Sequence, residues 1–330
     1  MRTKPLSIML ITVALFAAGM FSCKSEQSTP TKPKIKVIAI ANLQEHPILD
    51  AVQKGVLDEL NRAGYRDGST AKIIIRNANG DMQKVALIAK ELATLRPDVT
   101  VAITTPISQA IVKTTTRPIV FGALTDPVGA GIVVSLDQAV PDITGTTDAL
   151  PYEEQLKLVR RILPNAKRLG ILFNPGEAAS QFAIKEIRRV APSLGFELLE
   201  GPVSTTNDVY PVAQNLVTRV DVLLISTDNT VASGIAGAVK VAIGKKVPLF
   251  ACDSGSVEKG AIAAVSPGYY YIGVDTGKLA VRVLRGEGSL RVIPPQGGDI
   301  YINRKAAELM GCQLPDDVLK QATKIFEEIK

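Results

Sequence analysis

The chain has 330 residues, of which 46% are hydrophobic and 21% charged, so it can bury one or two ordinary cores and lacks the composition of a disordered protein. Its formal net charge of +6 is mild and dispersed, which argues against nucleic acid as a partner. With only three cysteines and one histidine, we expect neither a zinc site nor a metal or other cofactor.

The N-terminal segment has the layout of an export signal. Arg2 and Lys4 precede an apolar run over residues 6–20, which is too short for a comfortable membrane span. We therefore predict a signal peptide over residues 1–22 and an exported protein.

Cys23 directly follows a small residue, Ser22, and precedes a polar, proline-containing stretch. This order resembles the bacterial lipoprotein signal, in which the cysteine becomes the lipidated first residue. We expect a lipid-anchored chain at the cell surface or in the periplasm, with residues 23–33 as a tether; plain secretion is the alternative. The remaining cysteines, Cys252 and Cys312, are expected to be separate thiols, because one lies at a predicted strand end and the other in a late turn.

From residue 34, short apolar runs alternate with amphipathic helical stretches, which predicts parallel sheets covered by helices on both faces. In the first half we expect strands at 36–40, 73–76, 99–103 and 119–123, with helices at 48–63 and 82–95. In the second half we expect strands at 169–173, 197–199, 222–225, 248–251 and 261–265, with helices at 152–163, 179–190, 209–217 and 231–243.

Three breaks in this rhythm, near residues 145, 267 and 296, suggest that the chain crosses between two α/β lobes there. The predicted fold is two doubly wound parallel-sheet lobes joined by three hinge strands. The predicted first lobe comprises residues 34–145 and 268–295, and the second comprises 146–267 and 296–330.

The residues that directly follow two of the predicted strands are the main candidates for a binding site. The apolar run 99–103 stops at Thr104, Thr105 and Pro106, where a helix start would present free backbone N–H groups to an anion. A similar run in the second half ends in Asp228. Facing each other, the two ends would suit a zwitterion such as an α-amino acid, with its carboxylate near Thr105 and Ser108 and its ammonium at Asp228.

Ligands of open parallel sheets bind beyond the carboxyl ends of the strands, so other polar residues at those positions are candidates for the same site. The alternative for each of them is a cap or turn residue. The single histidine, His46, lacks recognisable triad spacing, which favours a pocket-wall or capping role over a catalytic base. The candidates beyond the two strand ends above are His46, Asp126, Asp148, Asn174 and Asp253.

Several motifs carry a family resemblance: NLQEHPILD at 42–50, TTP at 104–106, TDPVGAG at 125–131, ITG at 143–145 and TDN at 227–229. With them, nearly the whole chain after residue 34 resembles the exported ABC-transporter substrate-binding proteins of the tryptophan/tyrosine-type group. The resemblance implies a type I periplasmic-binding fold, an ABC permease as partner, and an amino acid held between the lobes, with tryptophan, tyrosine and phenylalanine as candidates. It also implies a cleft lined by His46, Thr105, Ser108, Asp126, Asp148, Asn174, Asp228 and Asp253.

One departure concerns the last hinge, where the family's Gly-x-Asp-Tyr-Tyr is replaced by Ser266-Pro267-Gly268-Tyr269-Tyr270, without the acidic residue. The leading hypothesis is a solute receptor of an ABC importer and not an enzyme. Two alternatives stay open: an exported α/β hydrolase or transferase that uses His46 with Asp126 or Asp253, and a sensory receptor that shares the binding fold.

Overall fold

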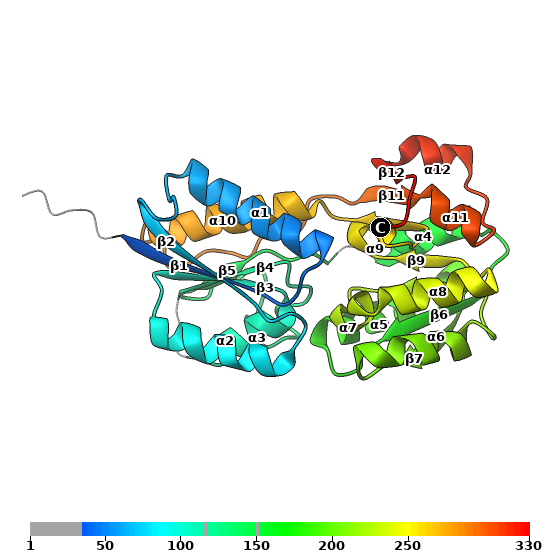
Figure 1. Cartoon of the computed structure of the whole chain (residues 1–330), viewed down its shortest axis with the longest axis horizontal. Helices are drawn as coiled ribbons and strands as arrows, with labels where there is room; N and C mark the ends of the chain where they lie inside the picture. Colours follow the sequence, from blue (N-terminus) through cyan, green and yellow to red (C-terminus); the bar gives the residue numbers. More distant parts are fainter. Residues whose placement is uncertain (1–34, 115–117, 150–151) are drawn as a thin grey trace, which may run out of the picture. The chain divides into compact units, whose positions relative to one another are not determined.

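The apolar runs of the first half form one five-stranded parallel sheet in the computed structural model, which describes residues 35–114, 118–149 and 152–330 (Figure 1). The strand order is β2-β1-β3-β4-β5. All residues of β3, β4 and β5 are buried, as expected for a sheet covered on both faces. The strands are β1 (Lys36–Asn42), β2 (Ala71–Asn77), β3 (Val99–Ile103), β4 (Ile119–Gly122) and β5 (Ile143–Gly145).

Helices α1 (Pro47–Arg62) and α10 (Tyr269–Leu284) cover one face of this sheet, and α2 (Met82–Leu95) and α3 (Thr105–Val112) cover the other (Figure 1). Alternate residues of β1 divide between the two cores: Ile38 packs with α1 and α10, and Ala39 with α2 and α3. We call this sheet with its four helices the first lobe.

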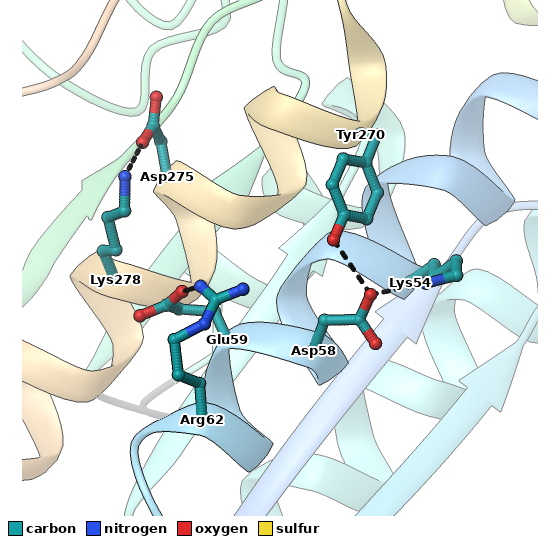
Figure 2. A network of polar contacts seen from close by, with 7 residues as sticks. All are labelled: Lys54, Asp58, Glu59, Arg62, Tyr270, Asp275 and Lys278. Atoms are coloured by element: carbon teal, nitrogen blue, oxygen red, sulfur yellow. Dashed lines mark hydrogen bonds and ion pairs between the residues drawn. The ribbon is translucent and has the colours of Figure 1, made fainter.

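Helices α1 and α10 are packed backbone to backbone. A Cβ on Gly273 would lie 2.1 Å from the carbonyl oxygen of Val52, and one on Gly55 would lie 2.3 Å from that of Tyr270. At the rim of the contact, Tyr270 Oη donates to Asp58 Oδ2 at 3.0 Å. Figure 2 shows this bond beside the ion pair of Asp58 with Lys54. The glycines therefore let α10, which follows a predicted crossing, sit directly on α1.

The second half forms a four-stranded parallel sheet in the order β7-β6-β8-β9. Its strands are β6 (Arg168–Phe173), β7 (Glu197–Pro202), β8 (Val222–Ile225) and β9 (Leu249–Ala251). The longer helices are α4 (Tyr152–Ile162), α5 (Ala178–Val190), α6 (Val209–Leu216) and α8 (Ile235–Lys245). The short ones are η1 (Pro192–Leu194), η2 (Thr206–Asp208), α7 (Asn229–Ser233) and α9 (Ser254–Glu258).

A small third sheet departs from the sequence-based prediction. Strand β10 (Ala263–Ser266) pairs antiparallel with β11 (Asp299–Asn303), which pairs with β12 (Lys324–Phe326). Helices α11 (Arg304–Leu309) and α12 (Asp316–Gln321) complete this part. The strand predicted at 261–265 begins two residues later and pairs antiparallel with β11 instead of joining the parallel sheet. β11 was not predicted, because only its last two residues are buried and it lacks a continuous apolar run. We call the four-stranded and three-stranded sheets with their helices the second lobe.

The predicted fold class, parallel-sheet α/β lobes covered by helices on both faces, is confirmed. The separate thiols of Cys252 and Cys312 are confirmed as well. Across the described ranges, the longest apolar helices fall short of what a bilayer crossing requires. The predicted signal peptide, Cys23 and the tether lie outside the described residues, and the lobe boundaries stay a prediction.

Candidate ligand-binding site

The carboxyl ends of β3 and β4 hold two residues in an unfavourable backbone conformation. Thr104 has φ 85° and Ala123 has φ 50°, the left-handed region that residues other than glycine rarely adopt. Both line one small cavity. Strain of this kind costs about 1–3 kcal/mol per residue and clusters at functional sites. Here it places the Thr104 hydroxyl at the cavity, where Oγ1 has no hydrogen-bond partner among the described residues.

Thr104 is also the residue before α3, and its side chain does not cap the helix. The first turn of a helix has backbone N–H groups that no helical carbonyl accepts, and the helix dipole makes this end positive. Thr105, the first residue of α3, lines the same cavity as Thr104. The predicted anion-binding feature therefore faces the cavity, with hydroxyl and backbone donors together.

The second lobe brings two buried carboxylates to this cavity, Asp228 after β8 and Asp253 after β9. Each precedes a short helix and caps it. Asp228 Oδ1 accepts from Val231 N at 2.8 Å, and its Oδ2 accepts from Asn174 N at 2.5 Å. Asp253 accepts from the backbone N–H of Ser256 at 2.7 Å and from its hydroxyl at 2.6 Å. Both acids therefore already accept hydrogen bonds from residues of the second lobe, to which they belong.

Glu177 is a neighbour of Asp228 that the sequence analysis did not single out. Its carboxylate accepts from the backbone N–H of Asn229 at 3.1 Å and of Thr230 at 2.9 Å, at the start of α7. Burial, with the Glu177 charge in addition, raises the pKa of Asp228 to about 6. Asp228 thus holds a proton more readily than an exposed carboxylate does.

A third carboxylate, Asp148, comes from the segment that follows β5. The hydroxyl of Tyr269, the first residue of α10, donates to Asp148 Oδ2 at 3.2 Å. The other oxygen, Oδ1, has no partner among the described residues, although Asp148 is only 7% exposed. Burial raises the pKa of Asp148. Asp148 and Tyr269 both line the cavity. Their hydrogen bond connects the segments near residues 145 and 267, where we predicted that the chain crosses between lobes.

His46 forms another part of the cavity wall and is 2% exposed. Neither ring nitrogen has a hydrogen-bond partner among the described residues. Burial lowers the pKa of His46, and the nearby Asp253 charge opposes this shift only in part. A histidine base needs an orienting partner, and the pocket-wall role predicted for His46 needs none, so this geometry is consistent with that role.

The cavity is small and adjoins a large groove. Its volume of about 40 Å³ exceeds the roughly 10–15 Å³ that one water requires, but it is far below the ~300 Å³ or more typical of ligand pockets. The groove has a volume of about 1010 Å³ and shares Gln44, Thr105 and Asn229 with the cavity. At this border Gln44 of the first lobe accepts a hydrogen bond from the Ser233 hydroxyl of the second.

Comparisons with known proteins place this arrangement in a family. The sequence profile of the ABC transporter substrate binding protein family matches residues 37–326. A tyrosine-binding protein from Clostridioides difficile (strain R20291) is 34% identical over 311 residues, which are 93% of this chain and 90% of the relative. The chain belongs to the ABC transporter substrate-binding proteins.

Two solved substrate-binding proteins are similar over their full length. One, from Streptococcus pneumonia and in complex with L-Trp, is 32% identical, has a TM-score of 0.85, and aligns over 88% of this chain and 100% of that one. The other, a ligand-free, open structure from Clostridium difficile, is 33% identical, has a TM-score of 0.68, and covers 89% of this chain and 100% of its own. At nearly equal identity, the conformation described here is more similar to the ligand-bound relative.

The structure brings together most of the predicted site residues. Five of them line the cavity, namely His46, Thr105, Asp148, Asp228 and Asp253, whereas Asn174 lines the adjoining groove. Ser108 and Asp126 line neither. The Ser108 hydroxyl donates to the carbonyl oxygen of Thr104 at 2.7 Å within its own helix, and Asp126 Oδ1 accepts from Gly129 N at 2.8 Å in a turn. These are the local roles that short polar side chains commonly take.

Ser226 and Tyr269 are among the cavity residues outside the predicted set. Ser226 directly follows β8, and its Oγ has no partner among the described residues. The sequence placed it next to an apolar run, where a serine gives no distinct signal. Tyr269 appeared in the sequence only as part of the motif at the last predicted hinge. Its position immediately after the Pro267-Gly268 pair was the available signal.

Proposed function

We propose that this substrate-binding protein captures an amino acid, with tyrosine and tryptophan as the first candidates, and delivers it to an ABC permease. The observation that carries the proposal is the cavity itself. It combines free donors at the start of α3 with buried carboxylates from other segments, and such a combination matches the two charges of a zwitterion. The tyrosine-binding relative and the relative in complex with L-Trp support the ligand class.

In the proposed pose the ligand carboxylate lies at Thr104 and Thr105, and the ammonium lies against the acidic side of the cavity. Asp228 is the ammonium partner proposed from the sequence. The ligand side chain extends toward the groove, whose first-lobe wall includes the small apolar residues Ala86, Ala89 and Ala110. Since the cavity is too small for a whole amino acid, binding requires the lobes to separate and close again.

We further propose that the mature protein is exported and anchored by a lipid on Cys23, which would keep the receptor beside its permease. The layout of residues 1–33 supports both export and lipid anchoring. The receptor role also implies that the ligand is released unchanged, so we expect no turnover.

Isothermal titration calorimetry against the twenty proteinogenic amino acids tests the function. We expect one site with stoichiometric binding of tyrosine, tryptophan or both, and recovery of the intact ligand. Because the chain contains no tryptophan, added tryptophan also reports its own capture through its fluorescence emission. If none of the twenty amino acids binds, the proposed ligand class is wrong.

A further inference from the structure

We infer that Asp148, and not Asp228, is the main acceptor for the cationic group of the ligand, and that Tyr269 positions it for this role. The inference rests on the proposed function, because it takes an amino acid as the ligand. It assigns to one carboxylate a role that the sequence had given to another.

The three acids that line the cavity differ in their hydrogen bonds. Asp228 and Asp253 each use both carboxylate oxygens to accept bonds from their own lobe, including a backbone N–H at the start of a short helix. Asp148 lies beside two hydroxyl groups, those of Tyr269, which donates to Oδ2, and of Thr125, and its Oδ1 has no hydrogen-bond partner within ordinary distance among the described residues. A buried carboxylate oxygen without a donor is unfavourable, so Asp148 gains most from a ligand that donates.

The electrostatic surroundings of Asp148 also favour a cationic ligand group. Thr125, Tyr269 and Asp253 are the side chains that act on the pKa of Asp148, and none of these three is a cation. Asp148 is only 7% exposed, and its electrostatic neighbours are the hydroxyl groups of Thr125 and Tyr269 and the carboxylate of Asp253. An ammonium group placed at Oδ1 would supply the missing opposite charge, and an ion pair formed in this buried place would be screened little by solvent.

Tyr269 holds the Asp148 carboxylate in position through its hydroxyl group. Burial raises the pKa of its hydroxyl well above the ordinary value, so the group remains protonated and donates to Asp148 Oδ2. Tyr269 begins α10, which is fixed on α1 by the close contact of Gly273 with Val52. Asp148 lies two residues after Thr146, which pairs with Ile293. The bond therefore holds the carboxylate, at the cavity that Asp148 lines, between segments that come from distant parts of the chain.

Two isosteric variants separate the candidates, Asp148→Asn and Asp228→Asn. Asparagine is also a good N-cap, so the second variant keeps the start of α7 while removing the charge. The probes are L-tryptophan and L-tyrosine, each compared with its N-acetyl derivative, which lacks the ammonium group. In the parent protein, we expect N-acetylation to weaken binding by more than tenfold.

We expect Asp148→Asn to raise the Kd of the free amino acid more than tenfold and to abolish most of the N-acetylation penalty. Asp228→Asn should keep the penalty within about threefold of the parent value. Tyr269→Phe should weaken binding of the free amino acid more than that of the N-acetyl form, which a purely structural role would not produce. Should Asp148→Asn fail to fold, the penalty retained by Asp228→Asn still decides the question.

The inference is overturned if Asp228→Asn abolishes the penalty, or if Asp148→Asn retains it. Failure of the proposed function looks different: the parent protein itself would then bind neither amino acid in calorimetry, which would remove the basis of the inference as well.

Discussion

His46 of the first lobe packs directly on Gly255 of the second, so closely that a Cβ on residue 255 would lie 2.6 Å from His46 Cε1 and 3.1 Å from Ile48 Cγ2. Gly255 belongs to α9 and has ordinary backbone angles, since it is absent from the residues with positive φ. The glycine is therefore needed for the approach of the two lobes and not for its own conformation.

Gly255→Ala should oppose closure of the lobes without preventing either from folding. We expect the Kd for the amino acid to rise about tenfold or more, because closure with this variant requires His46 to move. Small-angle scattering should show a smaller radius of gyration for the parent at saturating ligand, and little change for the variant. Gly244→Ala in α8 is the matched control, since a Cβ there meets no atom within 4 Å.

A second substitution tests whether the His46 contact is the cause. In the Gly255→Ala background, His46→Ala should recover part of the lost compaction, measured again as the radius of gyration with ligand. The two changes should then be non-additive, as expected for residues in contact. Additive losses in all measurements would assign the effect of Gly255→Ala to another contact.

The burial of His46 predicts a pH dependence of stability. Its pKa is lowered on folding from 6.5, so below pH 6.5 the unfolded chain binds more protons at this residue than the native protein does. The free energy of unfolding should therefore fall, relative to that of His46→Gln, as the pH decreases from 6.5 toward the native pKa. Urea titrations of both proteins between pH 5 and 7.5 measure this difference.

The comparison with His46→Gln is needed because two acids act in the opposite direction. The pKa of Asp228 is raised from 3.8 to about 6, so between these values the native state binds more protons, and this contribution increases stability as the pH falls. Asp148 has the same sign. If the difference between parent and variant is constant over the whole range, His46 is not the neutral buried group described here.

The contact of α1 with α10 predicts a large effect of one methyl group. A Cβ on Gly273 would lie 2.1 Å from Val52 O, a backbone atom that cannot turn away, so Gly273→Ala should lower the free energy of unfolding by ~1–3 kcal/mol or more. Tyr270→Phe, which removes only the hydrogen bond at the rim shown in Figure 2, should have a much smaller effect. Denaturation in urea, with Gly244→Ala as control, checks both. Equal losses for the two variants would contradict the close backbone packing.

The proposed anchor is tested by cell fractionation. Cys23→Ala should move the protein from the membrane fraction to the soluble exported fraction, because the lipidated residue would be lost. Cys312→Ala is the control, as this thiol is free and distant in sequence from the signal. Retention of Cys23→Ala in the membrane fraction would contradict lipidation at this residue.

Much of the architecture was predictable because it depends on local patterns. The mostly apolar run of β3 and the apolar run of β8 predict buried strands, and the four-residue spacing of Val52, Val56 and Leu60 predicts α1. The rule that ligands lie beyond the carboxyl ends of parallel strands then led to Thr105 and Asp228, which do line one cavity.

Tertiary contacts decided what those residues can do. The same short-range pattern produced Asp126 in a turn, Asp228 as a helix cap and Asp148 with one oxygen that no described residue donates to, and only the positions of their donors distinguish them. Tyr269 and Asp148 lie 121 residues apart in the sequence, and no periodicity relates them. The sequence by itself determined which side chains reach the ends of the strands. Packing between remote segments decided which of their polar atoms are already bonded and which remain for a ligand, because hydrogen bonding depends on distances that only the folded chain defines.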